Sequence, residues 1–176
     1  MLKGQILKVE AALFPMSTMN ISQGMDSNFS HKGNYCIDIT GATGLSEQAY
    51  APTALKVVMV SRTIWGNAIV WESLDKVLWA DGSYDYYCMR MNHDDNTSGI
   101  TIGTKYNQGD KIYDEGKSGK ATGIHIHLNV GRGKYIGMTT NIFGNSELKN
   151  EVEPYKLFYV NNTFLKNDKG YPWKTL

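Results

Sequence analysis

Short apolar runs separated by Gly, Asn, Asp and Ser turns dominate this chain. Their short spacing and their Val, Ile, Tyr and Trp content predict an all-β fold with an antiparallel core and at most short helices. The pair Asp81–Gly82 lies between two apolar runs and predicts a hairpin. The predicted strands are GQILKV, YCIDIT, ALKVVMV, NAIVWES, DYYCMRM and IHIHLNV, at 4–9, 35–40, 54–60, 67–73, 85–91 and 124–130.

The two ends of the chain are harder to assign from the pattern. A chain of 176 residues is long enough for one domain with a sizeable core. We interpret residues 1–13 as a lead-in or linker and residues 14–176 as a single domain. One short helix is expected within 145–158, stopped by Pro154.

Charge and cysteine content exclude several classes of protein. The formal net charge of +1 gives no electrostatic argument for a nucleic-acid partner or an anionic membrane. The longest apolar runs are far below the roughly 18 residues that span a bilayer. Lys3, Lys8 and Glu10 interrupt the first apolar stretch, which therefore does not have the pattern of a signal peptide. Cys36 and Cys88 are each predicted to be a free buried thiol, with a single bridge between them as the alternative.

Half of the four histidines lie in one predicted strand, ATGIHIHLNV. Successive side chains of a strand point to opposite faces, so His125 and His127 share a face. Two imidazoles side by side suit a metal, or catalysis at a metal, better than they suit packing. The other face of this strand is apolar and suits a core, with Ile124, Ile126, Leu128 and Val130.

A carboxylate interrupts a second apolar strand. Asp38 would share a face with Cys36, and a charge there is costly unless it is paired or binds a metal. Alone, Asp38 would be a hydrogen-bonded structural acid and His31 a loop histidine. Zinc hydrolases typically use three ligands from His and Asp or Glu and keep a fourth position open for water. His31, Asp38 and one of His125 or His127 would complete such a set.

The fourth histidine, His93, lies in MRMNHDDN, where a predicted strand enters a polar loop. Two interpretations stay open for it. It is either a surface loop histidine or a catalytic imidazole that does not bind the metal.

The segments SHKGNYCID, MNH and HIH resemble, in the same order, the three signatures of the lysostaphin/LytM-like zinc endopeptidases, which cut peptidoglycan cross-bridges. The resemblance covers residues 14–145 and implies a β-rich fold with a narrow groove and Zn²⁺ as cofactor. Carried over residue by residue, it makes three residues zinc ligands and two residues catalytic imidazoles. The ligands are His31, Asp38 and His127, and the catalytic residues are His125 and His93.

The spacing of the first signature departs from the family pattern. The family usually has HxxxD, whereas six residues separate His31 from Asp38. We interpret the longer spacing as a looped insertion after the histidine. If His31 is not a ligand, Cys36 is best placed to substitute, because it shares a strand face with Asp38.

Within the family, FPMSTMNISQG, WADGSYDY and GYPWKT resemble the peptidase domain of the tail-tip (tail-knob) proteins of small Bacillus podoviruses. This resemblance implies an enzyme carried on the phage virion tail that acts on the host cell wall, with other tail proteins as further partners. Release at lysis, as an endolysin, is the alternative location. Relatives cut glycine bridges or direct cross-links to a diamino acid, and both substrates stay open here.

Two other functions compete with the peptidase. A metal-binding cupin is disfavoured because no acid follows shortly after His127 and no later histidine exists. A catalytically silent tail-tip module with the same fold would serve in wall binding or assembly. Four aromatic residues are candidates either for the groove walls or for core packing, namely Tyr50, Trp65, Trp71 and Trp79.

Overall fold

The computed structural model describes residues 10–43, 46–161 and 163–176, and this part of the chain is almost entirely strands and turns. The predicted strand at 4–9 lies outside the described residues. The strands are β1 (Thr18–Gln23), β2 (Ile37–Ile39), β3 (Gln48–Tyr50), β4 (Leu55–Thr63), β5 (Gly66–Ser73), β6 (Val77–Leu78), β7 (Tyr84–Asp85), β8 (Tyr87–Asn92), β9 (Lys105–Tyr106), β10 (Lys111–Asp114), β11 (Ile126–Arg132), β12 (Met138–Thr140), β13 (Ser146–Leu148), β14 (Glu151–Val152) and β15 (Phe164–Asn167); a 3-10 helix, η1, spans Pro154–Lys156.

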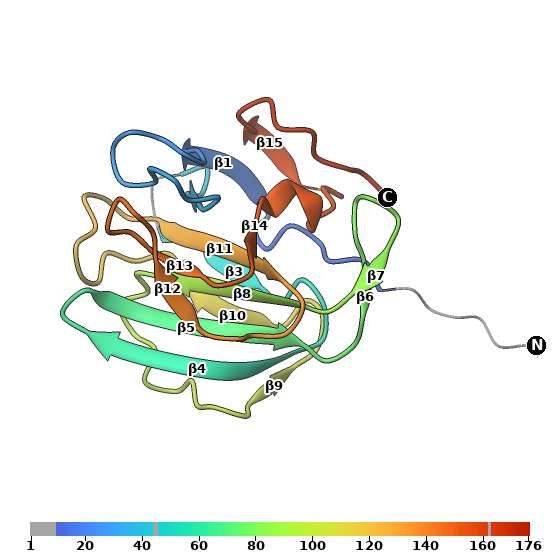
Figure 1. Cartoon of the computed structure of the whole chain (residues 1–176), viewed down its shortest axis with the longest axis horizontal. Helices are drawn as coiled ribbons and strands as arrows, with labels where there is room; N and C mark the ends of the chain where they lie inside the picture. The colour runs from blue at the N-terminus through green and yellow to red at the C-terminus, as the bar shows by residue number, and fades with distance from the viewer. Residues whose placement is uncertain (1–9, 44–45, 162) are drawn as a thin grey trace, which may run out of the picture.

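A nine-stranded sheet forms the body of the molecule (Figure 1). Its order is β15-β1-β2-β11-β8-β5-β4-β9, and β14 pairs with β11 off this path. All its pairs are antiparallel except β1 with β15, which is parallel. The predicted all-β fold with an antiparallel core is therefore confirmed.

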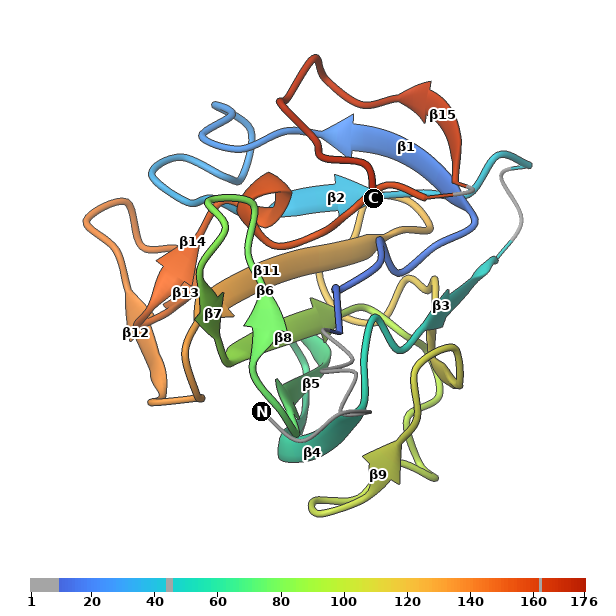
Figure 2. The same ribbon diagram turned by 90° about the vertical axis from the view of Figure 1, so that its right-hand side faces the viewer.

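Smaller two-stranded sheets cover the faces of the large sheet. The β12–β13 pair lies over one face and the β3–β10 pair lies over the other (Figure 2). Strands β6 and β7 form a hairpin on either side of the predicted turn, where Gly82 has a φ of 83° that favours glycine. The predicted hairpin is therefore confirmed.

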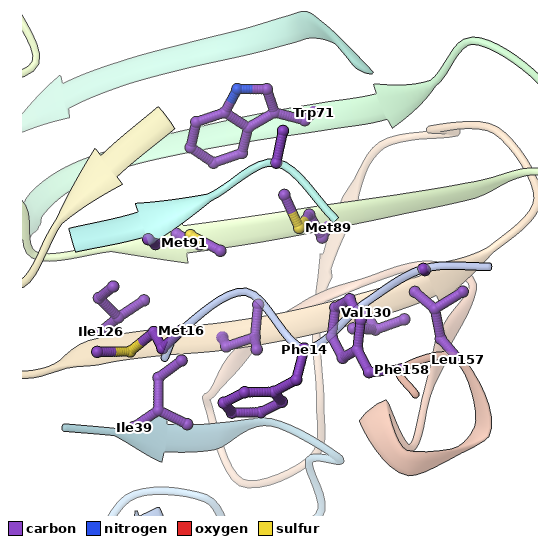
Figure 3. Close-up of a cluster of buried hydrophobic side chains, with 14 of the residues drawn as sticks. Phe14, Met16, Ile39, Trp71, Met89, Met91, Ile126, Val130, Leu157 and Phe158 are labelled. Atoms are coloured by element: carbon purple, nitrogen blue, oxygen red, sulfur yellow. The ribbon is translucent and has the colours of Figure 1, made fainter. Parts of the chain in front are cut away.

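The two faces of the central strands differ in chemistry. One face carries fully buried apolar side chains that pack into the main core with the chain around Phe14 and Phe158 (Figure 3). In β11 this face holds Ile126, Leu128 and Val130. Ile124, expected on the same face, precedes the strand and is 43% exposed. The opposite face is left for polar side chains at one end, and the candidate site lies there.

Trp71 and Trp79 are the largest side chains buried in this core. Trp71 is fully buried and packs edge-to-face on Tyr113, with ring centroids 5.6 Å apart, while its Nε1 has no hydrogen-bond partner. Trp71→Ala is expected to lower the free energy of unfolding by about 3–5 kcal/mol, because it leaves a large cavity. Trp71→Phe should cost less, since it keeps a ring and removes an unpartnered donor. Urea unfolding measures both, and an alanine variant as stable as the parent would contradict the packing argument.

The helix expected within 145–158 is absent, and that prediction was wrong. The segment forms β13, a turn, β14 and then η1, which begins at Pro154 rather than ending there. Pairing outweighs local helix preference here, because Val152 lies opposite Val130 and Glu151 opposite Gly131 of β11. Proline suits the first position of a helix, where its missing N–H is not needed.

The described part of the predicted lead-in contacts the body of the molecule. Ala12 is fully buried, and Leu13 forms a parallel bridge with Tyr159. Residues 1–9 lie outside the described residues, so the boundary at residue 13 stays a prediction. Cys36 and Cys88 are both free and buried, as predicted. In the described ranges, no helix is long and apolar enough to cross a bilayer.

Candidate metal centre and its groove

Three of the predicted site residues converge where β2 and β11 pair. Antiparallel register places Asp38 directly opposite His127, and Asp38 Oδ1 lies 3.0 Å from His127 Nδ1. His31, in the loop before β2, brings its Nε2 to 3.2 Å from the same oxygen. The His31 and His127 rings meet edge-to-face with centroids 5.0 Å apart.

The tautomer of His31 leaves one ring nitrogen facing a carboxylate. Its Nδ1 lies 2.9 Å from the Gly24 carbonyl oxygen, which can only accept, so Nδ1 carries the proton of the neutral ring. The remaining Nε2 is fully buried, has no hydrogen-bond partner, and faces the Asp38 carboxylate. Two facing electron-rich atoms repel each other unless a proton or a cation lies between them. This arrangement is the one expected of a metal ligand whose second nitrogen is fixed by a carbonyl.

The spacing of the donor atoms suits zinc. Zinc bonds to nitrogen and oxygen are about 2.0–2.2 Å long, so neighbouring ligands of a tetrahedral site lie about 3.3–3.5 Å apart. The distances from Asp38 Oδ1 to His31 and His127, 3.2 and 3.0 Å, are close to that value. The Cys36 thiol also lies nearby, within 4.8 Å of one nitrogen of each of these histidines. The residues therefore fit a zinc ion, with Asp38 better placed than Cys36.

Burial and charge prepare these groups for a cation. Burial alone would raise the pKa of Asp38, but the neighbouring His127 and His31 rings outweigh it and hold the pKa well below its usual range. Burial lowers the pKa of His127 to about 4 in spite of the neighbouring carboxylate. At neutral pH the site thus offers a carboxylate and a neutral imidazole, which are the forms that bind zinc.

Cys36→Ser tests the alternative ligand. Burial, with Glu151 and Asp38 nearby, raises the pKa of the Cys36 thiol, and a protonated thiol is a poor ligand. We expect the serine variant to keep one equivalent of bound zinc, measured by metal analysis after gel filtration. Loss of the metal would instead make Cys36 a ligand.

His125 and His93 lie beside the candidate metal ligands His31, Asp38 and His127. The His125 Nδ1 lies 2.9 Å from the Gly123 carbonyl oxygen and the His93 Nδ1 lies 2.8 Å from that of Ser118. Both rings therefore carry their proton on Nδ1 when neutral and present Nε2 as an acceptor. The two ring centroids are 4.7 Å apart, and His125 Nε2 lies 3.6 Å from Asp38 Oδ2. The structure thus brings all four histidines and Asp38 together.

His93 is held in a strained conformation at the end of β8. Its φ of 90° is rare for a residue other than glycine. The chain at Trp65 and Gly66, where β5 begins, crosses closely over the loop that contains Ser118 and Gly119. A Cβ on Gly66 would lie 3.0 Å from the Ser118 oxygen, and a Cβ on Gly119 would lie 2.2 Å from the Trp65 backbone. Only glycine permits this close crossing, which fixes the carbonyl that orients His93.

Two adjoining hollows meet over these residues. Both are lined by Gln23, Asp38, Thr122 and His125, and one continues past His93 while the other continues toward Thr40. Together they form a groove that is open on either side of the candidate metal centre. An extended chain could therefore cross the site rather than enter it by one end.

The four aromatic candidates do not line the two hollows. Trp71 and Trp79 are core residues, at 0% and 1% exposed, and Tyr50 borders a separate hollow. Trp65 is exposed and lies under the Lys120 ammonium group, which does line the groove. For Trp71 and Trp79, core packing was thus the right alternative.

Arg90 and Asn92 are among the polar residues of this groove that the sequence did not single out. Both lie on the face of β8 that carries the site, since Asn92 is opposite His127 and Arg90 is opposite Asn129. The reasoning that singled out Asp38, a charge inside an apolar strand, applies equally to Arg90 between Met89 and Met91.

The chain is similar in sequence to a phage protein. No family model matches it. Over 169 residues it is 37% identical to morphogenesis protein 1 of Bacillus phage B103, which covers 95% of this chain and 45% of that protein. The chain thus spans less than half the length of this relative.

Solved structures show the same fold. A zinc-containing peptidase from Vibrio cholerae has a TM-score of 0.51 at 24% identity, covering 69% of this chain and 37% of that one. The catalytic domain of the prophage-encoded M23 protein EnpA from Enterococcus faecalis has a TM-score of 0.52 at 19% identity, covering 82% and 95%. The SpoIIQ–SpoIIIAH pore-forming complex gives 0.57 at 14% identity, covering 85% and 92%.

Proposed function

Because this chain has the fold of the lysostaphin-like (M23) peptidases and is homologous to a phage morphogenesis protein, we propose that it is a zinc-dependent endopeptidase. Its proposed substrate is a peptide cross-link of bacterial peptidoglycan. The observation that carries the proposal is the buried, unpartnered Nε2 of His31, which faces Asp38 in an open groove.

Three residues would hold the metal, and two would move protons. His31, Asp38 and His127 would be the ligands, and zinc bound there would supply a Lewis acid that polarises the scissile carbonyl and acidifies water. We assign the general base to His125. Its Nε2 is an acceptor, and the Asp38 carboxylate 3.6 Å away stabilises the imidazolium that forms when the ring takes a proton. The same ring then gives that proton to the leaving amine.

His93 is assigned to the oxyanion. Burial lowers the pKa of His93, so the ring is neutral before reaction and its Nε2 is then an acceptor. To donate to the negative charge that develops on the substrate oxygen, Nε2 would first take a proton from solvent, because only the doubly protonated ring has a donor that is not held by the Ser118 carbonyl. The strained backbone and the Ser118 carbonyl keep the imidazole in place for this task.

The proposed place of action is the phage virion tail, where the enzyme would open the host cell wall, with release at lysis as the alternative. The similarity to a phage morphogenesis protein supports this proposal. Other tail proteins are its proposed further partners, and the single-domain assignment of residues 14–176 belongs to the same proposal.

A catalytically silent tail module is the second candidate. The fold also occurs in a pore-forming complex, so it is compatible with a role in assembly. Against it stands the convergence of all five predicted metal and catalytic residues in one open groove.

The test uses purified peptidoglycan from several Gram-positive walls and the zinc-loaded protein. We expect released muropeptides with one new amine and one new carboxylate at a single cross-link bond, identified by mass spectrometry. Intact walls after incubation with protein shown to hold zinc would favour the silent module.

A further inference from the structure

We propose that Arg90 binds a free carboxylate of the substrate peptide beside the scissile bond. The inference rests on the proposed endopeptidase function and narrows its substrate. If Arg90 has this role, cross-links with a free carboxylate next to the scissile amide are better substrates than cross-links that lack this carboxylate, such as glycine bridges.

Strand register places Arg90 next to the metal residues. Asp38, His127 and Asn92 form one row across β2, β11 and β8, and Arg90 belongs to the next row on the same face, opposite Asn129. Two residues along a strand span about 7 Å, so Arg90 lies about that far along the groove from the row that holds Asp38 and His127. Arg90 lines the same hollow as Asp38, His93 and His125.

The Arg90 guanidinium has no hydrogen-bond or ion-pair partner among the described residues. Its Nε is buried without a hydrogen bond, and no carboxylate of the described residues lies within ion-pair distance of the group. Burial lowers the pKa of Arg90, and the nearby Glu151 carboxylate opposes this effect. The oxygens of Glu151 do not bond to Arg90, because they accept hydrogen bonds from Tyr35 N, Asn129 Nδ2 and Leu148 N. The Arg90 side chain is half-buried, so an anion that pairs with it would gain charge-assisted hydrogen bonds, including one to the enclosed Nε.

Other unsatisfied polar atoms lie on the same face. Of the five buried side-chain atoms without a partner in the described residues, four belong to His31, Arg90, Asn92 and Asn129. The fifth belongs to Trp71 in the core on the opposite side of the sheet. This concentration in and beside the groove indicates a surface completed by a polar ligand rather than a packing defect.

The charge of the groove selects an anion. In the hollow that Arg90 lines, Asp38 is the one acid among the described residues, and it faces the histidines. Arg90 therefore meets no competing carboxylate there. A planar guanidinium matches a carboxylate in a two-bond fork, whereas a carboxamide offers one acceptor and no charge.

The experiment compares two synthetic cross-link peptides. In one, the residue that supplies the scissile nitrogen has a free α-carboxylate, and in the other this group is a carboxamide. We expect the protein to hydrolyse the carboxylate peptide with a kcat/KM roughly 10- to 100-fold higher. Arg90→Met should hydrolyse both alike, and Arg90→Lys should keep part of the preference.

Lys120→Met is the matched control, because it removes another cation of the groove whose ammonium group lies over Trp65. It should keep the preference for the carboxylate. Arg90→Met should keep its zinc and unfold at the same or a higher urea concentration, since it removes a half-buried charge that has no ion-pair partner among the described residues.

The outcomes separate this inference from the proposed function. Equal hydrolysis of both peptides by the parent protein, or an undiminished preference in Arg90→Met, would overturn the role of Arg90 and leave the endopeptidase standing. If neither peptide is cut, calorimetry measures the affinity of the parent protein and of Arg90→Met for both peptides. These affinities then show whether Arg90 binds the carboxylate. Equal affinity of the parent for both peptides would refute the carboxylate site.

Discussion

Asp38→Ala is expected to abolish both zinc binding and hydrolysis of peptidoglycan. A single oxygen of Asp38 lies 3.2 Å from His31 Nε2 and 3.0 Å from His127 Nδ1, so its removal takes away the group on which both imidazoles converge. The site would also lose its one negative charge against a divalent cation. Because changes to groups behind the ligands already cost 10- to 100-fold in affinity, loss of a ligand should weaken zinc binding by more than about 100-fold.

Zinc content after gel filtration and muropeptide release give the two measurements for Asp38→Ala. Glu72→Gln is the matched control, since Glu72 is also a buried acid but pairs with Lys56 away from the groove. It should keep both metal and activity. An Asp38→Ala protein that retains a full equivalent of zinc would disprove the proposed ligand set.

His125→Ala is expected to lower kcat by about 10²- to 10⁴-fold, the usual contribution of a positioned general base, while zinc stays bound. Its Nδ1 is tied to the Gly123 carbonyl and its Nε2 faces Asp38 Oδ2, so the ring lies beside the metal residues without belonging to them. Loss of activity with metal retained separates this residue from Asp38.

The same comparison applies to the second imidazole. His93→Ala should also keep its zinc and lose activity, because its ring adjoins that of His125 with its Nδ1 tied to Ser118. A His93 variant without zinc would show that the division between ligands and catalytic imidazoles is wrong. Equal activity of the parent and the His125 variant would assign the base elsewhere.

Much of this site could be predicted because strands alternate with a period of two. That period placed His125 and His127 on one face, and the cost of a buried charge singled out Asp38. The pairing of β2 with β11 lies beyond such reasoning, because neither strand carries a local signal for its partner. The resemblance to a family grouped Asp38 with His127, and the register places these two residues opposite each other.

What the sequence did not indicate depends on contacts between distant segments. The β1–β15 pairing is parallel and joins Thr18 to Phe164, and nothing in either stretch predicts it. The strain at His93 arises from its place at the end of β8, with its ring nitrogen held by the Ser118 carbonyl. The helix prediction near Pro154 was wrong because of such a distant contact, since β14 pairs with β11.

The sequence distance between the ligands also has a kinetic consequence. Asp38 and His127 are 89 positions apart, and their strands become neighbours only when most of the chain between them has been arranged. A fold with such long-range pairings passes its folding barrier slowly. Contacts that form after the folding transition state mainly change the unfolding rate. Zinc bound between these strands would therefore slow unfolding far more than it speeds folding. The zinc-bound protein would then persist because it unfolds slowly, rather than because its equilibrium free energy of unfolding is large.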